Sequence, residues 1–303
     1  SFNHGYAIVS ENDKHGLVNN NGEEILSPIN AYISYTQTPH EFEITSSYIE
    51  GKRGIFVAST RLLIKPRFKK IIEVKKDCVK VEVDDIGECL IDLSGCVFVE
   101  KDGKRITFPD WCIGVKHLSD NIFLGITDNG EWGLLNGSGE TLCMPTFDKI
   151  GEVDNDIIPL IKKETITVGG WRKETKEIMK YGLYNVNSKV FIPVEYDVCP
   201  EYSDGYYKIT LKGSLGIING EGEIVLKPEW KQILSTNGYY VVSKIIKENY
   251  SKNEKYGLAK SNGDLILETK YEAISVLRDG IYKVKENNSW SIFNNEGRIT
   301  TET

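Results

Sequence analysis

A short pattern of hydrophobic and polar residues recurs along this chain. Its clearest copy is Leu211–Ile233, LKGSLGIINGEGEIVLKPEWKQI, where a glycine precedes aliphatic residues and a polar Gly-containing turn leads to a second aliphatic run. A proline, an aromatic residue and an aliphatic residue follow. Short apolar runs with partial alternation, bounded by turn residues, are typical of β-strands. The pattern therefore predicts short strands joined by a tight turn, in which glycine supplies the backbone conformation that other residues resist.

The glycine-centred half of the pattern has eight copies. Six keep the glycine, at Gly16, Gly54, Gly133, Gly182, Gly216 and Gly257, and two degenerate copies have Cys89 and Ser291 in its place. A proline follows 12 residues later at Pro28, Pro66, Pro145 and Pro228, and 11 residues later at Pro193, whereas Thr269 takes this place after Gly257. Because the glycine, the turn and the proline keep nearly fixed distances, the chain is expected to be a tandem repeat.

One repeat unit is expected to form about four short antiparallel strands. Around Gly216 these strands are predicted at 216–218, 223–226, 230–234 and 239–242. The proline at 228 is expected to stand just before a strand, because proline cannot donate a hydrogen bond in the centre of a sheet. A sheet of this size cannot bury both faces alone, so neighbouring units must cover it.

The two ends of the chain predict a closed arrangement. Residues 5–10 form a strand without the Pro-aromatic strand that normally precedes it, and residues 290–303 end before their own Pro-aromatic strand. We therefore expect an all-β fold and a single domain over residues 1–303. The expected form is a β-propeller of about eight small blades, closed by pairing of the N- and C-terminal strands. Seven blades or an open β-solenoid are the alternatives.

Three copies carry a family resemblance. They are Glu131-Trp132-Gly133-Leu134, Lys180-Tyr181-Gly182-Leu183 and Lys255-Tyr256-Gly257-Leu258, each with its polar turn and trailing strand. This pattern resembles the WG-repeat (KWG) family of bacterial β-repeat proteins, over nearly the whole chain, although only one copy has a literal Trp-Gly. The resemblance implies a tandem β-repeat module that binds or scaffolds other molecules, and it implies no common catalytic residues.

Insertions indicate where binding is expected. The repeat spacing is lengthened at Lys162–Lys180 and Lys244–Lys255, both just before the glycine, so both loops are predicted to emerge from the same face; a third insertion, Cys96–Phe108, lengthens the hairpin after Cys89. Irregular loops on a regular scaffold often carry function. Trp171, Arg172 and Lys173 on the longest loop are the candidate binding residues, since Trp and Arg are favoured at interfaces. Trp171 folding back on the scaffold is the alternative.

Composition narrows the classes of partner and compartment. The net charge of −7 argues against nucleic acid. No apolar run is long enough to span a membrane and no signal peptide is recognisable in residues 1–5, although a signal peptide removed earlier stays an alternative. The six cysteines lack metal-binding spacing, so free core thiols and a cytoplasmic location are expected.

No linear motif indicates catalysis, a metal or a cofactor. The four histidines stand in unrelated contexts, and neither a nucleophile elbow nor a P-loop is present. We therefore expect a non-catalytic module whose partner is a protein. A small-molecule or glycan-binding propeller using aromatic residues such as Phe147, Tyr196 and Trp230 is the alternative, although their recurrence at one repeat position favours a core role; a hydrolase is less favoured.

Overall fold

A computed structural model describes residues 2–46, 51–119, 121–169, 173–236, 238–248, 251–278, 280–294 and 299–300. All the regular structure in these ranges is β-strand, and they contain no helix that could cross a membrane. The chain divides into two compact units, Ser1–Ile150 and Gly151–Thr303. The all-β fold predicted from the hydrophobic pattern is confirmed.

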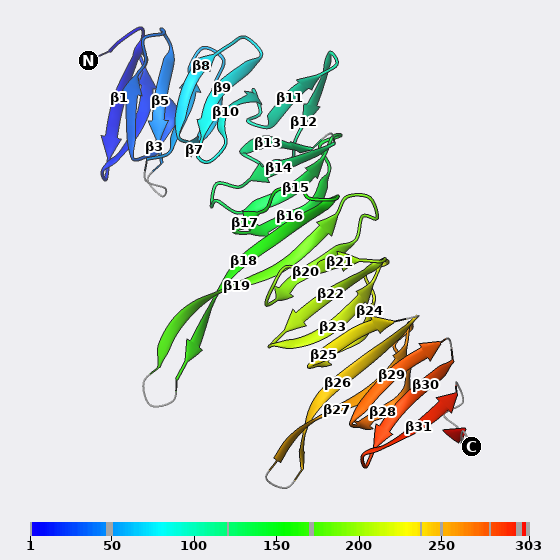
Figure 1. Ribbon diagram of the computed structural model, residues 1–303. Helices are drawn as coiled ribbons and strands as arrows, with labels where there is room; N and C mark the ends of the chain where they lie inside the picture. Colours follow the sequence, from blue (N-terminus) through cyan, green and yellow to red (C-terminus); the bar gives the residue numbers. More distant parts are fainter. Residues whose placement is uncertain are drawn as a thin grey trace. The chain divides into compact units, whose positions relative to one another are not determined.

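The first unit runs from blue to green in Figure 1. Its strands are β1 (Tyr6–Glu11), β2 (Lys14–Asn19), β3 (Glu24–Asn30), β4 (Tyr32–Tyr35), β5 (Glu41–Thr45), β6 (Arg53–Val57), β7 (Leu62–Phe68), β8 (Lys70–Val74), β9 (Cys78–Val83), β10 (Gly87–Asp92), β11 (Val97–Lys101), β12 (Lys104–Thr107), β13 (Gly114–Ser119), β14 (Ile122–Ile126), β15 (Trp132–Asn136), β16 (Thr141–Phe147) and β17 (Lys149–Ile150). They form the antiparallel sheets β1-β2-β3, β4-β5-β6-β7, β8-β9-β10-β11-β12 and β13-β14-β15-β16.

The second unit repeats the same sheet. Its strands are β18 (Ile157–Val168), β19 (Glu174–Asn185), β20 (Phe191–Tyr196), β21 (Glu201–Ser203), β22 (Tyr206–Leu211), β23 (Ser214–Asn219), β24 (Ile224–Trp230), β25 (Gln232–Thr236), β26 (Tyr239–Glu248), β27 (Ser251–Lys260), β28 (Leu265–Tyr271), β29 (Ala273–Arg278), β30 (Ile281–Glu286), β31 (Ser289–Asn294) and β32 (Ile299–Thr300). They form β18-β19-β20, β21-β22-β23-β24, β25-β26-β27-β28 and β29-β30-β31-β32.

Within each unit the hydrophobic cores lie between successive sheets. In the first unit, Leu17 of β2 packs in one cluster with Phe42 and Ile44 of β5. In the second unit, Ile217 of β23 and Val242 of β26 share a cluster, whereas Ile218, one residue along β23, belongs to the cluster on the opposite face of the same sheet. Adjacent residues of a strand point to opposite faces. Each inner sheet is therefore covered on both faces by its neighbours, as the small size of the repeat predicts.

The repeated glycine lies under a β-bulge. In the pairing of β23 with β24, Leu215 faces Trp230 and Ile217 faces Leu226, so Gly216 alone lies opposite three residues of β24. A Cβ at Gly216 would stand 2.7 Å from the carbonyl oxygen of Leu226 and 2.9 Å from the nitrogen of Pro228. Such distances leave no room for a side chain. The glycine is thus required by close approach of the neighbouring strand, and none of the repeat glycines has a left-handed backbone.

The same bulge accompanies every repeat glycine. The register shift recurs opposite Gly16, Gly54, Gly133, Gly182 and Gly257, and in each case a Cβ would lie under 3.0 Å from a backbone oxygen of the facing strand.

The proline of the repeat therefore belongs inside a strand, and the prediction that it stands just before one was wrong. Pro228 lies within β24 (Ile224–Trp230), and Trp230 ends this strand. Proline is tolerated at this point because β24 is an edge strand of its sheet and the bulge already interrupts the hydrogen-bond ladder. The next strand, β25, begins two residues after the aromatic residue.

In the degenerate copy around Cys89, the glycine, the proline and the bulge are all missing. The strand beside β10 is β11, which pairs with Leu90 and Ile91 only and contains no proline. No bulged strand passes over residue 89, so a side chain fits there, and Cys89 is buried in the core of the first unit. The inserted segment after it forms the hairpin β11–β12, which adds a fifth strand to this sheet.

A side-chain amide organises several of the repeat turns. The Oδ1 atom of Asn219 accepts hydrogen bonds from the backbone N–H groups of Glu221 and Glu223, while its Nδ2 atom donates to the Glu223 carboxylate at 3.0 Å. The same arrangement occurs at Asn19 and Asn136. Such Asx turns replace missing backbone bonds. Gly222, in the left-handed region at φ +90°, completes this turn.

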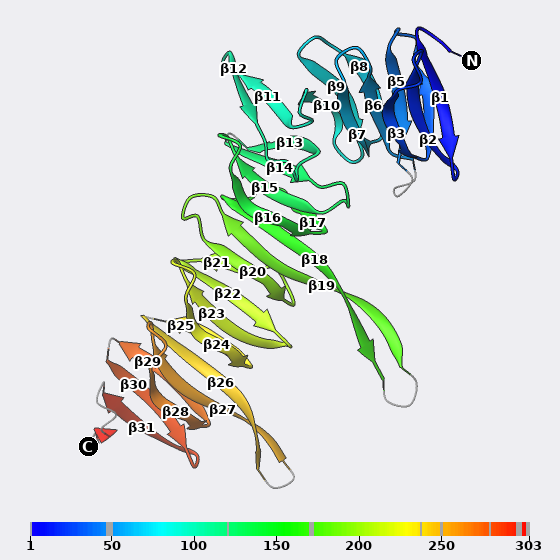
Figure 2. The ribbon, with the colours of Figure 1, turned by 180° about the vertical axis from the view of Figure 1, so that it is seen from behind.

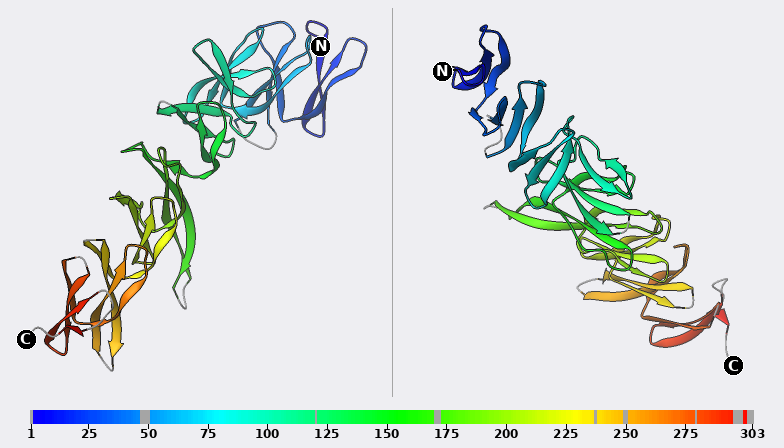
Figure 3. Two further views of the ribbon diagram at one scale, coloured as in Figure 1. Left: turned by 90° about the vertical axis from the view of Figure 1, so that its right-hand side faces the viewer. Right: turned by 90° about the horizontal axis from the view of Figure 1, so that it is seen from above.

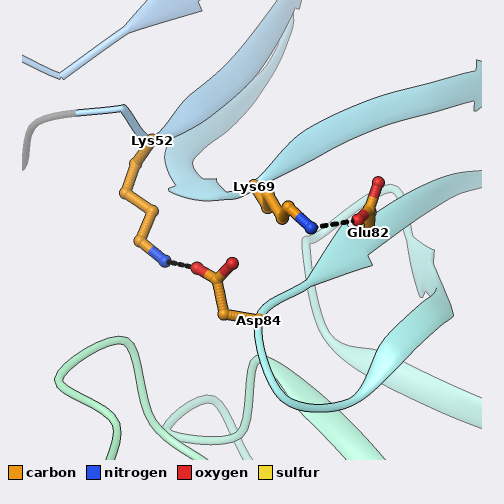
Figure 4. A network of polar contacts seen from close by, with 4 residues as sticks. All are labelled: Lys52, Lys69, Glu82 and Asp84. Carbon is orange, nitrogen blue, oxygen red and sulfur yellow. Dashed lines mark hydrogen bonds and ion pairs between the residues drawn. The ribbon is translucent and has the colours of Figure 1, made fainter.

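Ion pairs join the second and third sheets of the first unit. Lys52, just before β6, contacts Asp84, just after β9, at 2.5 Å, and Lys69 contacts Glu82 of β9 at the same distance (Figure 4). The Lys52 side chain is largely buried while Asp84 is half exposed. Because each pair has one partner that is at least half exposed, the pairs add little free energy of unfolding, and we infer that they mainly fix the orientation of the two sheets.

The terminal strands do not share a sheet, and the predicted closure is corrected. Among the described residues, β1 pairs only with β2, and β32 pairs with β31. At the C-terminal end, Ile299–Thr300 pairs with Ile292 and Phe293 as the edge strand of the sheet β29-β30-β31-β32.

Candidate functional site: two inserted hairpins

Two hairpins of the second unit are much longer than their sheets. Strands β18 and β19 pair continuously from Ile157 with Asn185 to Val168 with Glu174, and β26 and β27 pair from Tyr239 with Lys260 to Glu248 with Ser251. Both project on the same side of this unit in each view (Figures 1, 2 and 3). They correspond to the two insertions found in the sequence, and the prediction that they share a face is confirmed.

The outer parts of these hairpins have no strand beside them among the described residues. The strand β20 pairs with β19 at Tyr181, Leu183 and Tyr184 only, so residues 174–180 of β19 have no described strand on their outer edge. In the second hairpin, β28 pairs with β27 only from Tyr256 onward. Open strand edges present backbone N–H and C=O groups to solvent and can pair with another chain. The projecting ribbons therefore offer both side chains and backbone for recognition.

The first hairpin is held at its base by an ion pair. The Lys180 Nζ atom lies 2.7 Å from Oδ1 of Asp197, and the other oxygen of Asp197 accepts the backbone N–H of Gly213 at 2.9 Å. The hydrogen bond from Lys180 lowers the pKa of Asp197, and the bond from the backbone N–H of Gly213 adds to this effect. Burial of the carboxylate opposes them but is weaker than the bond from Lys180. The carboxylate therefore stays ionised at neutral pH and fixes the direction in which the ribbon leaves the sheet.

The base of the second hairpin carries a larger polar network. Glu254 of β27 forms an ion pair with Lys231 and accepts a hydrogen bond from the Ser243 hydroxyl at 2.7 Å. The hydrogen bond from Lys231, followed by that from Ser243, lowers the pKa of Glu254. Lys244 contacts Glu229 at 2.8 Å and lies 4.2 Å from the centre of the Trp230 ring. These contacts hold the base of the second hairpin against the end of β24 and the residue that precedes β25.

Sequence reasoning missed these anchoring residues, although a signal was present. Asp197 directly follows the core aromatic Tyr196, and Lys231 directly follows Trp230. Each carries a charge opposite to that of its partner on the hairpin, Lys180 or Glu254. In both pairs one partner directly follows the core aromatic residue. The other partner has the opposite charge and stands two or three residues before a repeat glycine, Gly182 for Lys180 and Gly257 for Glu254.

Only one of the three candidate binding residues lies among the described residues. Trp171 and Arg172 lie outside the described residues, so the choice between an exposed Trp171 and one folded on the scaffold stays open. Lys173 is exposed and directly precedes β19.

The repeated aromatic residues are core residues. Phe147, Tyr196 and Trp230 are between 2% and 4% exposed, which leaves no ring face for a glycan. Stacking on a sugar needs an accessible ring, so these residues cannot supply the glycan site considered from the sequence.

The cysteines offer no activated nucleophile. All six are free thiols, and Cys78, Cys89, Cys112 and Cys143 are buried. Burial raises the pKa of Cys112 and of Cys143 to about 12, so both are protonated at neutral pH. A protonated thiol is a poor nucleophile and a poor metal ligand. In the part of the chain that the structure describes, no group of three or more His, Cys, Asp or Glu side chains is placed to hold a metal ion.

Comparison with known proteins finds the repeat directly. The model of a family described as "WG containing repeat" matches residues 181–213, 216–244 and 256–290. These matches lie in the second unit, between Tyr181 of β19 and Trp290 of β31, and leave out residues 214–215 and 245–255. Comparison with curated proteins gives no match.

Solved structures with similar all-β chains share little sequence with this protein. They include BamB from Moraxella catarrhalis (10% identity, 95% of this chain and 96% of that one, TM-score 0.22) and Sqt1 from Saccharomyces cerevisiae (10%, 97% and 91%, 0.21). The Pan2 WD40 domain of Neurospora crassa is 11% identical over 88% of this chain and 75% of its own, with a TM-score of 0.23. Scores this low do not establish a common arrangement of sheets.

The matched repeats and the shared bulge describe one module. In the matched part, Gly182, Gly216 and Gly257 each lie under a bulged strand, and Gly16, Gly54 and Gly133 reproduce this geometry outside it. The repeats of this chain match the WG-containing repeat family over residues 181–213, 216–244 and 256–290.

Proposed function

We propose that this protein is a non-catalytic binding module that engages a protein partner through the hairpins β18–β19 and β26–β27. The observation that carries the proposal is the length of both ribbons beyond their sheets, at the same position of the repeat and on the same side of the second unit. Regular scaffolds commonly present their binding residues on such irregular segments.

The side chains of the ribbons favour a partner with an acidic surface. Residues 162–180 contain six basic and three acidic residues, and residues 244–255 contain four basic and two acidic ones, although the whole chain has a net charge of −7. Positive charge is therefore concentrated on the two projections. Charges of this kind steer association and select partners more than they add affinity.

Apolar side chains on the ribbons supply contact area. Val168, Met179 and Ile245 are 37%, 43% and 44% exposed. Together with the open edge of β19, they suit an extended partner segment that adds a strand to the ribbon, since main-chain hydrogen bonds give affinity and alternate side chains give selectivity in this mode.

The scaffold is proposed to be a succession of blade-like sheets within each unit, in which each sheet covers the next. Antiparallel sheets that cover one another in sequence order within each unit support this arrangement. In such an array each module depends on its nearest neighbours. The buried free thiols agree with a reducing, cytoplasmic environment for the module.

A site-specific cross-linking experiment tests the proposal. A photo-reactive amino acid is placed at Glu164 on the first ribbon or, as the control, at Asp128 in the turn between β14 and β15, and the protein is exposed to extract of its source cell. We expect a discrete cross-linked protein from position 164 that is absent from position 128. Joining residue 164, which keeps the photo-reactive amino acid, to its strand partner Ile178 through Asn-Gly removes the outer part of the ribbon and should abolish the product in material that keeps its circular dichroism spectrum. Identical products from both positions, or capture unchanged by shortening, would overturn the proposal.

A further inference from the structure

A cavity of about 490 Å³ opens between the second and third sheets of the first unit. One wall comes from β4, β5 and the turn between them, and includes Glu41 and Glu43. The opposite wall comes from β8 and includes Ile71, Ile72 and Val74. The cavity therefore sets carboxylates against aliphatic side chains, a combination that suits a ligand with one charged and one apolar end.

A β-bulge creates the apolar wall. In the pairing of β8 with β9, Ile71 faces Val81 and Glu73 faces Lys80, so Ile72 is the extra residue of the bulge. In a regular strand, consecutive side chains alternate between the two faces of the sheet. Here Ile71 and Ile72 both line the cavity, and Ile72 is 37% exposed. Bulges commonly redirect side chains in this way beside functional sites.

One carboxylate of the cavity lacks a countercharge. Glu43 is neutralised by Arg53 at 2.7 Å, and Glu73 by Lys75 at 3.5 Å. Among the described residues Glu41 takes part in no ion pair, and its carboxylate is bonded to the Thr38 side chain. Burial raises the pKa of Glu41, against the lowering effect of Thr38. A cation placed beside Glu41 would relieve this unfavourable desolvation.

The repeat provides a natural comparison in the second unit. The equivalent groove, between the sheets β21–β24 and β25–β28, has a volume of about 180 Å³. Counting from the repeat glycine, Tyr206 and Lys208 stand where the first unit has Glu41 and Glu43, and Ser235 stands where it has Glu73. The fold thus supplies a groove at both places, and the groove of the first unit is the larger. The second groove also has carboxylates, Glu201 and Asp204, but Glu201 stands where the first unit has Ser34, so the two grooves present their charges at different positions.

We propose that this cavity binds a small organic ammonium ion, with its charged nitrogen at the Glu41 carboxylate and its apolar part against Ile71 and Ile72. The ligand class comprises free aliphatic amines and the side chain of a lysine in a peptide, which present the same chemistry. The site is independent of the hairpins, so it stands or falls separately from the proposed function.

Calorimetric titration of the full chain at neutral pH tests the site. The probes are n-hexylammonium, the neutral isostere n-hexanol and Nα-acetyl-lysine N-methylamide, in an amine-free buffer. We expect saturable binding of the two cations and none of hexanol. Tighter binding of the lysine derivative assigns the site to peptide lysines, and tighter binding of hexylammonium assigns it to free amines.

Two matched variants locate the charge. Glu41→Gln should weaken binding about tenfold or more, the effect of losing one charge-assisted hydrogen bond. Glu73→Gln, in the same cavity but already neutralised by Lys75, should weaken binding less than about threefold, as a partly screened charge does. Because both variants change one exposed or half-exposed glutamate, circular dichroism should be unchanged. Absence of saturable binding by either cation, equal loss in the two variants, or binding of hexanol as tight as that of hexylammonium would overturn the proposal.

Discussion

At the scale of single residues, the repeat is controlled by a missing side chain. Gly216 has an ordinary backbone conformation, so its role differs from that of turn glycines such as Gly222, which lies at φ +90°. What Gly216 provides is room for the carbonyl of Leu226. The free energy at this position therefore depends on steric contact with a neighbouring strand.

Replacement of Gly216 by valine is expected to destabilise the protein by roughly 1–3 kcal/mol, because the added Cβ meets backbone atoms that cannot move without losing the bulge. Thermal and urea unfolding measure the change. Gly220→Ala is the control, since a Cβ there meets only the oxygen of Gly205, at 3.1 Å. An unchanged melting temperature for Gly216→Val, or an equal loss in the control, would refute the close-approach role.

Acid titration of stability should identify the ion pair at the base of the first hairpin. The pKa of Asp197 in the folded protein lies below its ordinary value of 3.8. The stabilisation from its charge is therefore fully present above this value and is lost as the pH falls through the folded pKa. Asp197→Asn should lower the melting temperature at neutral pH, and the difference from the unaltered protein should shrink below about pH 4.

Asp128→Asn, in the turn between β14 and β15, is the control for Asp197→Asn. The hydrogen bond from Lys180 is the largest cause of the lowered pKa of Asp197. In a protein that already carries Lys180→Met, adding Asp197→Asn should therefore change the melting temperature by nearly the same amount at neutral and at acid pH. A melting difference that stays constant from neutral pH into strong acid would show that the carboxylate charge contributes nothing.

At the scale of strands and hairpins, much of the structure was predictable from spacing. The distances between glycine, turn and proline predicted the order of strands and the common position of both long hairpins. The bulge was not predicted, because a proline within an apolar run ordinarily indicates a strand end. Only the paired registers show that Pro228 faces Gly216 across an interrupted ladder.

The cavity in the first unit could not be predicted from the sequence either, because it also depends on which residues face each other across strands. Glu41 and Ile72 belong to successive repeats, and neither stands in a motif. Their proximity depends on how two sheets stack and on a one-residue bulge in β8. The charge pairing of Glu43 with Arg53, which leaves Glu41 without a countercharge, is likewise visible only across neighbouring strands.

At the scale of the whole molecule, each compact unit contains its own cores. The clusters built around Tyr207, Trp230 and Tyr282 consist only of residues between Ile157 and Phe293, all in the second unit. Stability in repeat arrays is approximately a sum of modules and nearest-neighbour interfaces. The prediction of one domain over residues 1–303 stays a prediction.

Residues 151–303 are expected to fold when expressed alone, because the hydrophobic clusters described for this unit contain no side chain from the first one. A β-type circular dichroism spectrum with a cooperative thermal transition is the expected result. A fragment beginning at residue 187 is the control. It lacks β18 and β19, and therefore Leu183, which belongs to the cluster around Tyr207. If 151–303 is unfolded while the full chain is folded, the nearest-neighbour description fails.

The bulge also limits the order in which a copy of the module can diverge. Around Gly257 the proline is already replaced by Thr269, yet the glycine and the bulge persist. Around Cys89 the glycine is gone, and so are the proline and the bulge. A duplicated module can therefore mutate its proline first at small cost, whereas its glycine becomes free to change only after the facing strand has straightened. We therefore expect the proline of a copy to be substituted before its glycine. Which of the two residues a copy has lost then indicates how far it has diverged.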